Sequence, residues 1–123
     1  MFELKVTTHF AAAHQLQMVA KKCENLHGHN WKVEVCVKGE KLNEAGVLID
    51  FGILKTHIRE LIHLLDHKFL NELEYFDNGN PPSSENIAVF IADRLQEKIN
   101  EKGVVVSRVT TWESEDACAT YTP

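Results

Sequence analysis

The segment at residues 29 to 38 carries an apolar side chain at every second position from 31 to 37, and this pattern constrains the fold more than any other feature of the chain. Alternate residues of a strand project from opposite faces, so this segment predicts a strand with one apolar face. Four side chains would form that face: Trp31, Val33, Val35 and Val37. An apolar sheet face has to be buried against a second layer of structure.

The middle of the chain predicts that this second layer consists of two helices. A first helix should open at Asp50 or Gly52 and end near Asp66 and His67, with apolar residues three and four apart: Leu54, Ile58, Leu61, Ile62 and Leu65. A loop follows at 75–84, and Ser83 or Ser84 can cap the second helix. We expect the second helix to bury a similar stripe and to stop at Gly103: Ile87, Phe90, Ile91, Leu95 and Ile99.

Three further extended segments complete the predicted sheet. The first runs from residue 2 to about 9 or 10, and the last two are expected at 104–112 and 117–121, with a short extended piece at 47–51. The order ββααββ predicts an α+β fold in which a four-stranded antiparallel sheet carries both helices on one face. Its 123 residues are expected to form a single domain. Because the sheet would have two open edges, we expect a homo-oligomer in which sheets join.

Composition and charge exclude several classes of function. The net charge of −5 argues against a nucleic-acid partner, since phosphate binding needs a basic face. No apolar run approaches the length of about 20 residues that spans a bilayer, so we expect no membrane association. Three cysteines without a signal-peptide pattern at the N-terminus favour reduced thiols and a cytoplasmic location.

Three histidines form a candidate metal site near the start of the second strand. His27 and His29 are two residues apart, so their rings should project from the same face of that strand. The glycine between them, Gly28, leaves room for another group to approach. His14 would reach the same place if the first two strands pair. Three histidines around zinc leave one coordination position open, which is typical of catalytic zinc. Incidental polar histidines remain the alternative.

Cys23 lies four residues before His27 and has two possible roles. A thiol beside a divalent cation has a lowered pKa and is partly thiolate near neutral pH, so Cys23 could act as a base. It could instead be a fourth ligand, which would close the site and make it structural. The spacing alone leaves both roles open.

Two other places carry polar groups suited to proton transfer or ligand binding. Asp66 and His67 could form a proton relay in which the carboxylate orients the ring, or they could be solvated residues at a helix end. Glu113 follows Trp112 at the end of a predicted strand. A carboxylate there can accept two parallel N–H bonds from a guanidine-like group, although a terminal Glu is often simply solvated.

Together these residues resemble the 6-pyruvoyl-tetrahydropterin synthase family. The resemblance rests on the three histidines with His27-Gly28-His29, the upstream Cys23, the Asp66-His67 pair and the late Glu113. The three-residue gap between Cys23 and His27 is similar to that of the bacterial branch, 6-carboxytetrahydropterin synthase. One departure is Ser114, where the family commonly has Thr after the Glu.

The resemblance implies a fold, an assembly and a role for each residue. The fold is the tunnelling fold, whose subunits join edge to edge into barrels, commonly hexamers. His14, His27 and His29 would bind Zn2+, and Cys23 would accept a proton. Two further roles are implied by it: proton transfer by Asp66 and His67, and binding of the pterin ring by Glu113, which would also join the proton relay.

The implied reaction converts 7,8-dihydroneopterin triphosphate to 6-carboxy-5,6,7,8-tetrahydropterin, acetaldehyde and triphosphate, a step of queuosine and deazapurine biosynthesis. Three alternatives remain: a 6-pyruvoyl-tetrahydropterin synthase with the same site, a non-catalytic metal- or pterin-binding protein, and a structural zinc protein with Cys23 as the fourth ligand. Acetaldehyde release separates the two enzymes, and a zinc–sulfur bond in the resting protein would favour the structural role.

Overall fold

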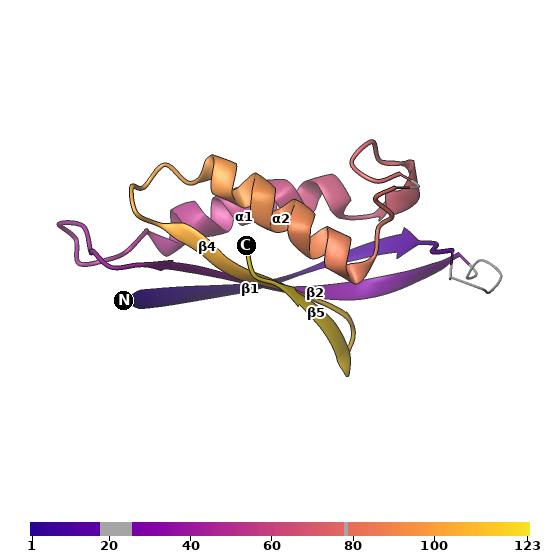
Figure 1. Cartoon of the computed structure of the whole chain (residues 1–123), viewed down its shortest axis with the longest axis horizontal. Helices are drawn as coiled ribbons and strands as arrows, with labels where there is room; N and C mark the ends of the chain where they lie inside the picture. Colours follow the sequence, from indigo (N-terminus) through magenta and orange to yellow (C-terminus); the bar gives the residue numbers. More distant parts are fainter. Residues whose placement is uncertain (18–25, 78) are drawn as a thin grey trace.

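A single sheet carries both helices on one of its faces (Figure 1). The computed structural model describes residues 1–17, 26–77 and 79–123. Its elements are, in order, β1 (Phe2–His14), β2 (His27–Gly39), α1 (Phe51–Leu65), β3 (Lys68–Phe69), the 3-10 helix η1 (Leu70–Glu72), α2 (Ser84–Lys98), β4 (Val105–Ser114) and β5 (Ala117–Tyr121). The predicted α+β class is confirmed.

In the described part of the chain the sheet has five strands in the order β3-β1-β2-β4-β5, not the predicted four. The additional strand is β3, whose two residues pair parallel with Ala12 and Ala13, whereas the other neighbours pair antiparallel. It forms because the chain turns at His67, which has a φ of 60°, and then runs along β1. Two residues are too few to show any alternation in the sequence. The piece expected at 47–51 forms no strand.

The first two strands are longer than expected, and the extra length positions the site. β1 continues through the alanines at 11–13 to His14, and β2 already begins at His27. Alanine has little intrinsic preference for strands, but pairing with β2 provides every residue of this stretch with a partner. The two strand ends therefore lie side by side.

The core lies between the sheet and the helices. The four apolar side chains predicted for one face of β2 are completely buried. All five residues of the predicted α1 stripe are buried too, and in α2 the buried members of the stripe are Ile87, Ile91 and Leu95, with Phe90 and Ile99 packing at the margin. Burial of one such side chain stabilises the fold by about 1.5 to 3 kcal/mol.

Helix caps fix where each helix begins and ends. The Asp50 side chain accepts a hydrogen bond from the Ile53 N–H, and Ser83 caps α2 by accepting from the Asn86 N–H. α2 ends at Lys98, earlier than the predicted stop at Gly103. Gly103 has a φ of 82° and belongs to the following turn, in which the Val104 N–H bonds to the Glu101 carbonyl. None of the described helices is long and apolar enough to cross a membrane.

Candidate metal and substrate site

The pairing of β1 with β2 brings three histidines together at one end of the sheet. His14, the last residue of β1, is the register partner of His27, the first residue of β2, and Ala12 is the partner of His29. The three histidines share the sheet face that packs against the helices, because they continue the alternation of the buried residues Phe10 and Trp31. The three histidine rings therefore lie close together, as predicted.

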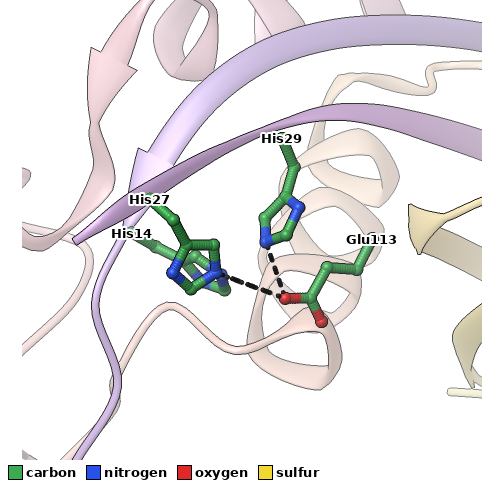
Figure 2. A group of neighbouring side chains, drawn as sticks. All are labelled: His14, His27, His29 and Glu113. Atoms are coloured by element: carbon green, nitrogen blue, oxygen red, sulfur yellow. Dashed lines mark hydrogen bonds and ion pairs between the residues drawn. The ribbon is translucent and has the colours of Figure 1, made fainter. Parts of the chain in front are cut away.

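Glu113 joins the same group from β4, and Figure 2 shows all four side chains converging. The Glu113 Oε1 atom lies 2.8 Å from His29 Nε2, 3.2 Å from His14 Nε2 and 3.7 Å from His27 Nε2. The Nε2 atoms of His14 and His27 are 3.2 Å apart. One ligand atom from each of the four residues thus lies within 4.8 Å of the other three.

A β-bulge places Glu113. On β4, Trp112 pairs with Cys118 and Ser114 pairs with Ala117, so Glu113 is an extra residue without a partner on β5. Bulges bend a strand and redirect side chains, and they are frequent beside active sites. The side chain of Glu113 remains 36% exposed, so it contacts the histidines and is also open to a ligand.

The orientation of the completely buried His14 ring is fixed by the main chain before α2. Its Nδ1 atom lies 2.8 Å from the carbonyl oxygen of Pro82, which can only accept a hydrogen bond. Nδ1 therefore carries the hydrogen, and the lone pair of a neutral His14 is on Nε2, directed at the other members of the cluster. Such a hydrogen bond from the second ring nitrogen is common in metal-binding histidines.

The four groups fit a divalent cation better than they fit one another. Glu113 Oε1 has no hydrogen to donate, so it cannot bond to the Nε2 lone pair of His14. Among the described residues, the buried His29 Nε2 atom makes no regular hydrogen bond, and the polar atom beside it is Glu113 Oε1 at 2.8 Å. Tetrahedral ligands at 2.0 to 2.1 Å from zinc would be roughly 3.3 to 3.4 Å apart, close to the two 3.2 Å separations.

Burial also favours the ligand form of His29. Desolvation, the largest effect, lowers the pKa of His29 below its ordinary value, and the neighbouring His27 and His14 act in the same direction, while Glu113 opposes them. A lowered pKa keeps the ring neutral, which is the form that binds metals. Trp31 packs against two of the rings, since its own ring contacts those of His14 and His29 edge to face.

Asp66 and His67 form a separate pair at the end of α1. The Nδ1 atom of His67 is 3.0 Å from Asp66 Oδ2, and the His67 side chain is 81% exposed. Asp66 Oδ1 accepts the Ala11 N–H at 2.9 Å, and the His67 N–H donates to the Ala11 carbonyl. The Ala11 N–H bond is the main reason that the pKa of Asp66 is below its usual value.

An open hollow of about 520 Å³ lies beside His67 on the sheet face opposite to the histidine cluster, because Ala11, Ala13, Gly28 and Asn30 alternate along β1 and β2 with the residues that face the cluster. It extends from Gly28 and His29 across β1 to His67 and Lys68. A side chain at Gly28 would meet only the Ala12 carbonyl oxygen, 3.8 Å away, so the space above this glycine is open as expected. Among the described residues, the group that could share one metal ion does not contain Asp66 or His67.

The sequence reasoning missed two features of the site and left one untested. It did not find the Pro82 carbonyl, because a main-chain acceptor leaves no mark in a sequence. It placed Glu113 near a substrate but not against the histidines, and no residue pattern in the sequence indicates the bulge. Cys23 lies outside the described residues, so its role stays a prediction.

Comparison with known proteins agrees with this fold. The family model for 6-pyruvoyl tetrahydropterin synthase matches residues 3–123. A protein of Archaeoglobus fulgidus, provisionally named 6-carboxy-5,6,7,8-tetrahydropterin synthase, is 40% identical over 114 residues, covering 93% of this chain and 90% of its own length. The protein of that name from Synechocystis is 39% identical over 93 residues, which is 72% of this chain and 70% of its own.

Two further relatives extend the comparison. A dihydroneopterin monophosphate aldolase of Pyrococcus furiosus is 35% identical over 107 residues, covering 87% of this chain and 85% of its own. The structure of Caenorhabditis elegans 6-pyruvoyl tetrahydropterin synthase superposes with a TM-score of 0.84 at 25% identity, covering 99% of this chain and 95% of that one. The chain belongs to the 6-pyruvoyl tetrahydropterin synthase family.

Proposed function

We propose that the chain is a zinc-dependent lyase that converts 7,8-dihydroneopterin triphosphate and water to 6-carboxy-5,6,7,8-tetrahydropterin, acetaldehyde and triphosphate. We place this step in queuosine and deazapurine biosynthesis. The observation that carries the proposal is the convergence of His14, His27 and His29 beside Glu113, in a chain whose relatives include proteins named for this product.

His14, His27 and His29 would hold the zinc ion through their Nε2 atoms. Bound zinc makes an attached hydroxyl more acidic and polarises a carbonyl oxygen. The chain supplies the remaining chemistry. His14 is kept in its ligand tautomer by the Pro82 carbonyl, and the buried Trp31 excludes water from the inner side of the rings.

Glu113 would bind the pterin. Its carboxylate can accept two parallel N–H bonds from the ring N–H and the amino group, a charge-assisted arrangement that also fixes the orientation of the ring. In Figure 2 one carboxylate oxygen approaches the histidines and the other points away from them. The partial exposure of this side chain supports access by a substrate.

Cys23 and the Asp66–His67 pair would move protons. Cys23 would take a proton from the side chain of the substrate as a thiolate, a form that a nearby cation favours. His67 would return protons, with Asp66 holding Nδ1 so that Nε2 is the exchanging atom.

We also propose that the chain forms a homo-oligomer, with a hexamer favoured, in the cytoplasm. β3 pairs with only two residues of β1, so in the described part of the chain most of the outer edge of β1 has no strand beside it. Unpaired edges of this length are usually joined to another chain or covered. Sedimentation measurements of the purified protein test the oligomer directly.

Incubation of the zinc-loaded protein with 7,8-dihydroneopterin triphosphate tests the reaction, with product mass and acetaldehyde as readouts. We expect stoichiometric acetaldehyde and a carboxylated tetrahydropterin. A Cys23→Ala variant should keep one zinc per chain and lose activity. A three-carbon product without acetaldehyde would instead identify a 6-pyruvoyl-tetrahydropterin synthase. Loss of zinc from Cys23→Ala would support the structural role of the thiol, and no turnover by the zinc-loaded wild type would favour a binding protein.

The similarity to a dihydroneopterin monophosphate aldolase supports a second candidate. An aldol cleavage breaks the bond between the first two side-chain carbons, so the phosphate would stay on a two-carbon aldehyde. A parallel incubation with 7,8-dihydroneopterin monophosphate separates the candidates. Release of a phosphorylated two-carbon aldehyde, with no reaction of the triphosphate, would favour the aldolase.

A further inference from the structure

We propose that Ser84 and Thr111 are positioning residues that lock the start of α2 onto β4 and so hold both Pro82 and Glu113 against the histidine cluster. This inference rests on the proposed metal function of that cluster. Neither residue belongs to the cluster itself.

The two side chains form a reciprocal, buried set of hydrogen bonds. The two hydroxyl oxygens lie 2.7 Å apart, the Ser84 hydroxyl lies 3.0 Å from the Thr111 carbonyl oxygen, and the Thr111 hydroxyl lies 2.6 Å from the Ser84 carbonyl oxygen, so the two hydroxyl hydrogens are shared among these three contacts. Ser84 is 8% exposed and Thr111 is not exposed at all. Since buried polar groups are costly without partners, this set fixes one relative position of helix and strand.

On the helix side, Ser84 lies two residues after Pro82, whose carbonyl oxygen accepts the hydrogen bond from His14. Pro82 is buried, and both of its neighbours in the chain, Pro81 and Ser83, make hydrogen bonds. The Asn86 amide donates to the Pro81 carbonyl at 2.8 Å, the Ser83 N–H donates to the same carbonyl at 2.8 Å, and Ser83 caps the helix. The Pro82 carbonyl therefore moves with the start of α2, which the Ser84–Thr111 bonds attach to β4.

On the strand side, Thr111 lies two residues before Glu113, the bulged residue of β4. Thr111 still has regular partners on both neighbouring strands, Val33 and Ala119. The bulge at Glu113 bends the strand away from that regular pairing. The Ser84–Thr111 bonds thus attach the last regular part of β4 to the segment that orients His14. A shift of helix against strand would move the Pro82 carbonyl and Glu113 relative to each other.

The neighbouring residue Thr110 provides a matched control. Its hydroxyl also bonds to another hydroxyl at 2.7 Å, that of Thr120 on β5, and it is nearly as buried at 7% exposure. As the adjacent residue of a strand, Thr110 projects from the opposite face, away from the helix segment that carries Pro82. Thr110→Val and Thr111→Val remove the same chemical group one residue apart.

The test measures zinc affinity by chelator competition in the purified full chain. We expect Thr111→Val and Ser84→Ala to raise the Kd for zinc by roughly 10- to 100-fold, the usual effect of removing a group that orients a metal ligand. Thr110→Val should change the Kd for zinc less than about twofold, because Thr110 does not orient a metal ligand. Thr111→Ser keeps the hydroxyl and should restore the wild-type value. Ser84→Ala leaves the Ser83 cap intact, and it decides the matter if Thr111→Val does not fold.

A second readout does not need the metal. In the metal-free protein, the hydrogen on His14 Nδ1 should give a slowly exchanging signal in ¹⁵N-edited NMR spectra. We expect this signal in the wild type and in Thr110→Val, and its loss or rapid exchange in Thr111→Val. A merely structural role would lower the unfolding midpoint of both valine variants and leave this signal in place.

The outcomes separate the two proposals. Equal zinc affinity and an unchanged His14 signal in Thr111→Val and Ser84→Ala would overturn the positioning role, and so would an equal loss in Thr110→Val. If the wild type binds no zinc, the proposed metal function fails, and the His14 signal alone decides whether Ser84 and Thr111 position the ring.

Discussion

Replacement of Glu113 by Gln tests which of two contacts this carboxylate makes in the working protein. Its Oε1 atom lies 2.8 to 3.7 Å from the three Nε2 atoms, which would suit a fourth metal ligand. Its bulged position and partial exposure suit a pterin anchor. We expect the anchor to be its principal role, because three histidines are enough for catalytic zinc and leave the fourth position to the substrate.

The magnitude follows from the hydrogen bonds that the substitution removes. In Glu113→Gln the new amide would have one acceptor oxygen where the carboxylate has two, and its amide hydrogens would face an N–H of the pterin. Loss of a hydrogen bond to a charged group costs about 1.5 to 3 kcal/mol. The lost hydrogen bond and the opposed donors together should weaken transition-state binding by about 3 kcal/mol, which corresponds to a decrease in kcat/KM of roughly 150-fold. Because the site is partly solvated, the Kd for zinc should rise less than about tenfold.

The assay combines steady-state kinetics at saturating zinc with a zinc titration of the same preparation. Glu115→Gln is the control, since it removes an equal charge two residues away on an exposed turn. The reasoning is wrong if Glu113→Gln loses zinc affinity more than tenfold but keeps a normal kcat/KM once zinc is saturating. That result would make Glu113 a metal ligand and would leave the pterin without the anchor that we assign.

Three further predictions concern the metal, a helix cap and acid stability. Zinc at about 100 times its Kd should stabilise the protein by about 2.7 kcal/mol in thermal unfolding, and His14→Ala should abolish this gain; an equal gain in the variant would place the metal elsewhere. Ser83→Ala should lower the free energy of unfolding in urea by about 1 kcal/mol, because the Asn86 N–H loses its acceptor. The lowered pKa of Asp66 stabilises the fold above the ordinary value of 3.8, and this contribution is lost as the pH falls through the lower folded pKa. Asp66→Asn keeps an acceptor for the Ala11 N–H but loses this dependence, so circular dichroism should show a shallower acid transition below pH 3.8; an unchanged transition would contradict this.

The elements with strong periodicity were predictable because the burial of one face determines them. The stripe of α1 and the inward face of β2 are buried as the sequence indicated. Apart from the short strand β3, the errors are at the ends of elements, where periodicity carries no information. Gly103 was expected to stop α2, but its positive φ belongs to the turn that starts at Glu101. The alanines at 11–13 show no strand preference, yet they pair with β2 over their whole length.

The site divides in the same way into a local part and a part that requires the whole sheet. His27 and His29 are neighbours because strands alternate, and a sequence shows this directly. His14 joins them through the register of one antiparallel pair, which its position before a loop made plausible. Glu113 is 99 residues from His14, and its place depends on the register of β4 against β2 and on a bulge that follows.

Long-range placement of this kind explains why the supporting residues were harder to find than the candidate ligands. Histidines are chemically conspicuous, and their spacing can be judged from the sequence alone. The Pro82 carbonyl, Ser84 and Thr111 are ordinary groups whose importance comes from where the packing of α2 on β4 places them. The histidine cluster therefore depends on the hydrogen bonds between α2 and β4 as much as on the residues that would bind the metal. Substitutions of Ser84 and Thr111 are the most direct way to separate the formation of the site from the formation of the fold.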